Sequence, residues 1–141
     1  MTQQETEMFI MQKGSYFPQT QVPYLQEMLS KKENISFDDL WSVPLKNPTT
    51  ALLLSIAGGT LGIDRFWLRQ PVSALLKLML TICYLVFYVV GSIQEDPSWG
   101  VIIGMLVAMA AVFIWYIIDI TSASRRAQAL NYSTFLTYLT H

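Results

Sequence analysis

Hydrophobic and polar positions divide this chain into a mixed N-terminal stretch and three apolar runs. In residues 1–46 the apolar side chains recur at helical spacing, as in Val22, Leu25, Met28 and Leu29, which predicts short amphipathic helices. A stretch of ~40 residues seldom builds a stable core alone. We therefore expect this region to lie against a membrane surface or against the apolar helices.

The three apolar runs occupy residues 49–63, 72–93 and 99–118. The second and third are long enough, at ~1.5 Å rise per residue, to cross the ~30 Å hydrocarbon layer. They predict two transmembrane helices joined by a turn at residues 94–98. The first run is short, so a re-entrant or tilted helix competes with a true span. The predicted fold class is all-α: a helical integral membrane protein with two to three transmembrane or re-entrant helices and short N-terminal amphipathic helices.

This pattern predicts a cytoplasmic helical region at residues 1–46, a membrane domain at 47–121 and a helical tail at 122–141. The tail could continue the third helix beyond the bilayer, cap the charged face or dock a partner. No signal-peptide pattern is visible in the first 30 residues, so we expect the N-terminus to stay on the cytoplasmic side of the cell (inner) membrane.

Basic residues test the topology, because cytoplasmic loops of membrane proteins are enriched in Lys and Arg. If all three runs span, the two sides carry almost equal numbers of cations and nothing is decided. If the first run dips in and returns, all of these cations lie on the cytoplasmic side, and Glu95 and Asp96 lie outside. The count favours the re-entrant arrangement. The cations concerned are Lys31, Lys32, Lys46, Arg65, Arg69, Arg125 and Arg126.

Composition argues against most chemistry. The chain is 52% hydrophobic and 13% charged, with a net charge of −1, which predicts neither a nucleic-acid surface nor an acidic binding face. Its one histidine is His141 and its one cysteine, Cys83, lies in an apolar run. Membrane-embedded hydrolysis needs a nucleophile with a base, paired carboxylates or a metal. We therefore expect no enzymatic activity, no metal, no cofactor and no small-molecule substrate.

Charges beside apolar runs carry the strongest signal. Arg65 follows the first run, Lys77 lies inside the second and Asp119 ends the third. A charge at the centre of a membrane helix costs roughly 2.5–3.5 kcal/mol, so such groups usually pair or reach for the interface. Because the second and third runs cross and return, Asp119 lies on the face that holds Asp64 and Arg65. We predict a contact from Asp119 to Arg65 or Lys77, against the alternative of simple snorkelling and solvation.

Small residues four apart lie in two stripes. Such spacing lets helices approach closely, which predicts a tightly packed bundle, either within one protomer or between copies. Aromatic rings, including Trp67, Trp99 and Trp115, lie at the ends of the runs, as expected at headgroup level. The stripes are Ser55 with Gly59, Gly58 with Gly62, and Gly100 with Gly104 and Ala108.

At these residues, over roughly 45–131, the chain resembles the TM-2 domain family, small proteins with two transmembrane segments joined by a loop bearing an Asp-Arg-Phe motif. It departs in having Trp67 where Tyr is common, Arg69 where Gly is usual, which puts a tight turn there in doubt, and an added apolar hairpin around residues 94–98. The resemblance implies a fold and no established enzymatic activity. It rests on Lys46-Asn47-Pro48, Gly58, Gly59, Gly62, Asp64-Arg65-Phe66-Trp67, Lys77, Trp115, Asp119 and, after the last helix, Asn131-Tyr132.

Two functions follow from the pattern. The first is a structural or adaptor membrane protein, or an accessory subunit, that packs its helices against itself or another membrane protein and presents its N-terminal helices to a cytoplasmic partner. The second is a homo-oligomeric channel or transport element in which Arg65, Lys77 and Asp119 line a polar path. An intramembrane enzyme has the least support.

Overall fold

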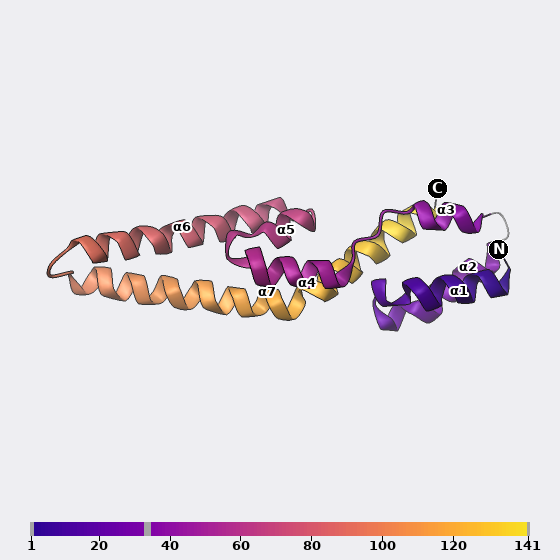
Figure 1. Cartoon of the computed structure of the whole chain (residues 1–141), viewed down its shortest axis with the longest axis horizontal. Helices are drawn as coiled ribbons and strands as arrows, with labels where there is room; N and C mark the ends of the chain where they lie inside the picture. The colour runs from indigo at the N-terminus through magenta and orange to yellow at the C-terminus, as the bar shows by residue number, and fades with distance from the viewer. Residues whose placement is uncertain (1, 33–34, 141) are drawn as a thin grey trace. The chain divides into compact units, whose positions relative to one another are not determined.

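The computed structural model describes residues 2–32 and 35–140, and every regular element in those ranges is helical (Figure 1). The chain divides into two compact units. Unit 1 comprises residues 1–50 and 124–141, and unit 2 comprises residues 51–123. The elements are α1 Gln3–Lys13, η1 Gly14–Tyr16, η2 Gln19–Gln21, α2 Val22–Lys31, α3 Phe37–Ser42, α4 Pro48–Gly58, η3 Gly59–Leu61, α5 Ile63–Trp67, α6 Pro71–Ile93 and α7 Trp99–Thr140.

Unit 1 consists of α1 to α3 and the C-terminal part of α7. Helix α1 begins with a capping box: Thr2 Oγ1 accepts the Glu5 N–H and the Glu5 carboxylate accepts the Thr2 N–H, which satisfies two end groups. This hydrogen bond from the Thr2 backbone lowers the pKa of Glu5. Helix α2 carries Pro23 near its start, where proline is tolerated because the first turn lacks acceptors for its N–H groups.

An aromatic core joins the N-terminal helices to the tail of α7. Phe135 stacks on Phe9 with ring centroids 5.5 Å apart and tilts against Phe17 at 5.2 Å. The sequence did not predict that these two regions share a core, although a pairing of this kind explains how a short N-terminal stretch can be folded. The buried core residues are Phe9, Phe17, Leu25, Leu29, Leu40, Val43, Phe135 and Leu139.

Asn131, in the C-terminal part of α7, hydrogen-bonds the segment that precedes α4. Its buried side-chain carbonyl accepts the Lys46 N–H at 2.6 Å, and its amide donates to the carbonyls of Lys46 and Tyr16 at 2.7 and 2.9 Å. The resemblance places Asn131 and Tyr132 after the last helix. The structure shows instead that α7 continues through both residues as far as Thr140.

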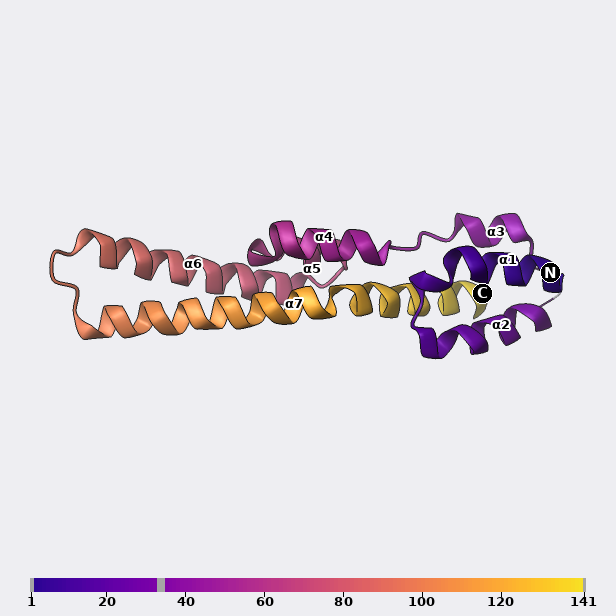
Figure 2. The same ribbon diagram turned by 60° about the horizontal axis from the view of Figure 1, so that its bottom comes forward.

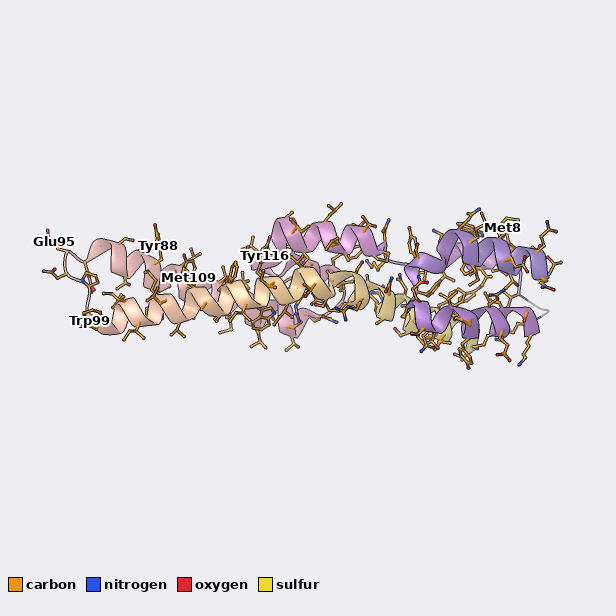
Figure 3. The ribbon with its side chains drawn as sticks, turned by 90° about the horizontal axis from the view of Figure 1, so that it is seen from below. Met8, Tyr88, Glu95, Trp99, Met109 and Tyr116 are labelled. Carbon is orange, nitrogen blue, oxygen red and sulfur yellow. The ribbon has the colours of Figure 1, made fainter. Side chains whose placement is uncertain are left out.

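Unit 2 is built on two long antiparallel helices, α6 and the first part of α7, joined by a turn at residues 94–98 as the sequence predicts (Figure 2). Glu95 and Trp99 mark this end of the hairpin in Figure 3. Both helices are long and apolar enough to cross a membrane, yet only 11% and 6% of their most apolar windows are buried. The core helix of a soluble protein would be mostly covered. Apolar faces this exposed suit lipid as solvent, which makes the chain an all-α membrane protein.

The first apolar run does not form one long helix. Helix α4 ends at Gly58 and has 11 residues. At ~1.5 Å rise per residue, a helix of this length is too short to cross the ~30 Å hydrocarbon layer. The chain then turns through η3 and Gly62, and α5 runs back along α4. Helix α6 begins at that end and runs in the same direction as α4 (Figures 1 and 2). Gly62 has φ +74°, and a Cβ there would lie 2.9 Å from the Ala74 carbonyl oxygen. Only glycine combines this backbone conformation with such close packing against α6.

A tight turn forms at Arg69, although arginine stands there where glycine is usual in the family. The Gln70 N–H donates to the Arg65 carbonyl and the Arg69 N–H to the Phe66 carbonyl, which is the Schellman pattern of a helix end. Arg69 has φ +60° at the position where glycine is favoured. The turn therefore survives with a strained residue in it.

Arg69→Gly is expected to raise the free energy of unfolding by about 1 kcal/mol, because a non-glycine residue in the left-handed region costs about 1–2 kcal/mol. Chemical unfolding in detergent micelles measures the change. Gln70→Gly is the matched control and should be neutral or destabilising, since no positive φ occurs at that position. Equal effects of the two substitutions would contradict strain at Arg69.

Candidate functional site

Two cationic side chains of unit 2, from α5 and α6, bind one carboxylate on α7. Arg65 of α5 donates from Nε and Nη2 to Asp119 Oδ1, with the Nε bond at 3.1 Å. Lys77 of α6 donates from Nζ to Asp119 Oδ2. The sequence predicts a contact with one cation or the other, and the structure confirms both. We call Arg65, Lys77 and Asp119 the ion cluster.

Burial makes the ion cluster energetically important. The side chains of Asp119 and Lys77 are 0% and 2% exposed, and that of Arg65 is 14% exposed. Removing one partner from such a group leaves an uncompensated buried charge. The ion cluster therefore fixes α5, α6 and α7 to one another, and the snorkelling alternative for Lys77 is wrong.

Trp115 completes the arrangement from one turn before Asp119 on α7. The Arg65 guanidinium carbon lies 5.6 Å from the centroid of the Trp115 ring, a cation–π distance. Arg65 is thus held between a carboxylate and an indole on the same helix face.

The other motif residues lie in α5 beside Arg65. Asp64 is completely buried in the first turn of α5. Phe66 is exposed and Trp67 is half-buried. Within the Asp-Arg-Phe motif, the arginine binds the carboxylate on α7.

Two further residues, which the sequence reasoning missed, hold the reversal after α4. Thr81 of α6 donates its hydroxyl to the Thr60 carbonyl at 2.7 Å, and Tyr116 of α7 donates its phenol to the Ile56 carbonyl at 3.0 Å (Tyr116 is labelled in Figure 3). Carbonyls at a helix end have no partner inside the helix, and irregular backbone in a membrane must be satisfied by protein or water. A hydroxyl inside an apolar run was the available signal for Thr81.

The small-residue stripes pack within the chain. Gly59 is buried, and a Cβ there would lie 3.4 Å from the Tyr116 ring. A Cβ on Gly104 would lie 2.9 Å from the Phe87 ring of α6. Gly100, at the exposed end of the third stripe, has only Ser98 within 4 Å of such a Cβ. These two contacts join η3 to α7 and α6 to α7. The remaining stripe members, Ser55, Gly58, Gly62 and Ala108, are all buried.

Within residues 2–32 and 35–140, no cluster of three or more His, Cys, Asp or Glu side chains is arranged to hold a metal ion. Cys83 is exposed on α6. His141 lies outside the described residues.

Comparisons with known proteins bear on the family. The model of the TM2 domain family matches residues 44–94, which include α4, the Asp-Arg-Phe motif and α6. The match ends before α7, whereas the resemblance drawn from the motifs extends to Asn131 and includes Trp115 and Asp119. Neither the curated proteins nor the solved structures give a match to the chain. Over residues 44–94 the resemblance is confirmed: this segment matches the TM2 domain, a membrane-associated domain with no established activity.

Proposed function

We propose that this protein is a structural or accessory membrane subunit without enzymatic activity, which packs its helices against a membrane partner or a second copy. The observation that carries the proposal is the ion cluster. Its carboxylate accepts from both cations, so its charges stabilise the fold of unit 2 and are not arranged around an open site. The exposed apolar faces of α6 and α7 supply surface for lateral packing.

Unit 1 supports the adaptor part of this proposal. It has its own aromatic core, formed by residues from both ends of the chain, and charged, polar helix faces. A folded polar unit of this kind can present a fixed surface to a cytoplasmic partner.

Photo-crosslinking from two exposed positions tests the proposal. A photoreactive residue replaces Met11, which is 89% exposed on α1, or Val107, which is 64% exposed on α7. At native expression, a heterologous membrane protein captured from Val107 and a partner captured from Met11 support an accessory subunit with an adaptor face. Self-adducts at Val107 support homo-oligomeric packing. Adducts no more specific than those of an unrelated membrane protein would contradict the proposal.

The channel alternative has a separate test. It requires the charges of the ion cluster to contact water along a path, whereas Lys77 and Asp119 are buried against each other. Purified protein in liposomes is expected to show no ion flux above empty liposomes. Flux that disappears in Lys77→Met would replace the accessory-subunit proposal with the channel.

We further propose that α4, η3 and α5 form a re-entrant segment, with both ends of the chain in the cytoplasm and residues 94–98 outside. The reversal of α5 after α4, which brings the chain back before α6 begins, supports this topology. Under this topology, the seven basic residues outside the long apolar runs that were counted from the sequence lie on one side, as the distribution of Lys and Arg in membrane proteins favours.

Cysteine labelling is expected to place Ser42→Cys and Gln70→Cys on one side and Glu95→Cys on the other, in a Cys83→Ser background. All three positions are exposed in the structure. A membrane-impermeant maleimide should label only Glu95→Cys in intact cells and the other two in inverted vesicles. Opposite sides for Ser42→Cys and Gln70→Cys would show that the first run spans.

A further inference from the structure

Arg65 heads an apolar groove on the surface of unit 2. The groove is lined by Arg65 together with Ala111, Ile114, Trp115 and Ile118 of α7. Arg65 lies at the Asp119 end of α7, and the aliphatic lining leads from there toward Ala111, two turns deeper into the apolar stretch. The groove thus has a cationic head and a hydrocarbon-like body.

The hydrogen-bond donors of Arg65 indicate which chemical group could bind at the cationic end of the groove. A guanidinium has five N–H donors. Within the described residues Asp119 is the only acceptor, and it is reached through Nε and Nη2. The remaining donors belong to a side chain that is 14% exposed and lies at the groove. Donors left without an acceptor beside hydrocarbon cost several kcal/mol each, so the surroundings must supply an oxygen.

Chemistry narrows the occupant to a phospholipid. Arg and phosphate form charge-assisted, bidentate hydrogen bonds, and Trp115 offers an amphipathic ring of the kind found at headgroup level. A free phosphate would satisfy Arg65 but would leave Ala111, Ile114 and Ile118 uncovered. A second protein helix would cover the apolar side chains, but it would have to carry a further carboxylate into the membrane-facing groove, which is costly.

We propose that this groove is a binding site for one anionic phospholipid, with the headgroup phosphate on the free edge of the Arg65 guanidinium and one acyl chain along Ala111, Ile114 and Ile118. An anionic headgroup is favoured over a zwitterionic one because the ammonium of the latter would be brought near the two cations of the ion cluster. The lipid would therefore bind Arg65, the residue that holds α5 against α7 through Asp119.

The test compares two phenylalanine substitutions in the intact chain. Ala111→Phe fills the groove and leaves the ion cluster untouched, whereas Ala110→Phe places the same side chain on an exposed neighbouring position that does not line the groove. Each purified protein is offered equal amounts of phosphatidylglycerol and phosphatidylcholine in detergent, and bound lipid is counted by native mass spectrometry. Thermal unfolding confirms that both variants fold.

The wild type and Ala110→Phe are expected to retain one phosphatidylglycerol per chain with about a tenfold preference over phosphatidylcholine, because both lipids carry the phosphate but only the choline ammonium would lie near the cations of the ion cluster. Ala111→Phe should lose about tenfold in retention. Equal retention of both lipids, or an Ala111→Phe variant that behaves as Ala110→Phe, would overturn the proposal. Displacement of the lipid by millimolar inorganic phosphate would show a simple anion site, and a disulfide-linked dimer through Ala111→Cys would show a second copy in the groove.

Discussion

Asp119→Leu is expected to lower the free energy of unfolding by about 3–5 kcal/mol, the cost of leaving a buried charge without its partner. Lys77, 2% exposed, would face the new apolar side chain with its ammonium unpaired, and Arg65 would lose its acceptor. Unfolding in mixed micelles, followed by circular dichroism, measures the change. Asp96→Leu, at the exposed turn between α6 and α7, is the matched control and should change stability by no more than about 0.5 kcal/mol.

A double-mutant cycle separates the ion pair from a general effect of the substitution. Lys77→Met alone leaves Asp119 paired with Arg65, so its cost should be smaller than that of Asp119→Leu. The double variant should be more stable than Asp119→Leu alone, because the buried ammonium has been removed with its partner. Strict additivity of the two single effects would contradict a direct interaction.

The structure also changes what a charge swap can achieve. The sequence alone suggests that reversing Arg65 and Asp119 together should restore part of the lost stability. Because Lys77 also donates to Asp119, an arginine at position 119 would lie beside Lys77. We therefore expect little rescue from the pair Arg65→Asp and Asp119→Arg, and more when Lys77→Met is added.

Gly62→Ala is expected to destabilise unit 2 by about 2–5 kcal/mol. Its φ of +74° costs an alanine about 1–2 kcal/mol, and the added Cβ would lie 2.9 Å from the Ala74 carbonyl oxygen and 3.2 Å from its Cα. Overpacking against backbone atoms, which cannot move away as a flexible side chain can, adds about 1–3 kcal/mol. The same unfolding assay in micelles measures the loss.

Gly100→Ala is the matched control for this substitution. A Cβ at Gly100 meets only Ser98 Oγ, at 3.9 Å, and Gly62 is the only described glycine with positive φ. Alanine is also the better helix former, so Gly100→Ala should be neutral or slightly stabilising. If both variants lost the same stability, the close approach of Gly62 to α6 would not be the cause.

Periodicity and hydropathy were sufficient for the helical elements, because each depends on a pattern along one segment. The second predicted run, 72–93, matches α6 to within one residue at each end. The third predicted run begins at residue 99, where α7 begins. The ion cluster could also be anticipated, since charged residues beside apolar runs need partners and a hairpin returns the chain to the same face. The sequence did not indicate that one carboxylate serves both cations.

The departures arose where segments distant in the chain meet. Phe9 and Phe135 are far apart in sequence, and no local pattern indicates that they stack. Thr81 and Tyr116 each cap a carbonyl near the end of α4, and those acceptors exist only because the chain reverses there. At Arg69 the residue type predicts against a tight turn, yet Arg69 adopts the left-handed conformation because the hydrogen bonds of its neighbours form the turn.

The sequence by itself determined that this protein is helical and that two of its segments are long and apolar enough for a membrane. It also predicted a contact from Asp119 to Arg65 or Lys77, with snorkelling and solvation as the alternative. Burial of apolar surface and the cost of charge are properties of residue types and short periods, so they can be read along the chain. Only the tertiary structure decided that the first apolar run breaks at Gly58, that Asp119 joins Arg65 to Lys77, and that both ends of the chain form one core. Those outcomes depend on which side chains and carbonyls meet across separate helices.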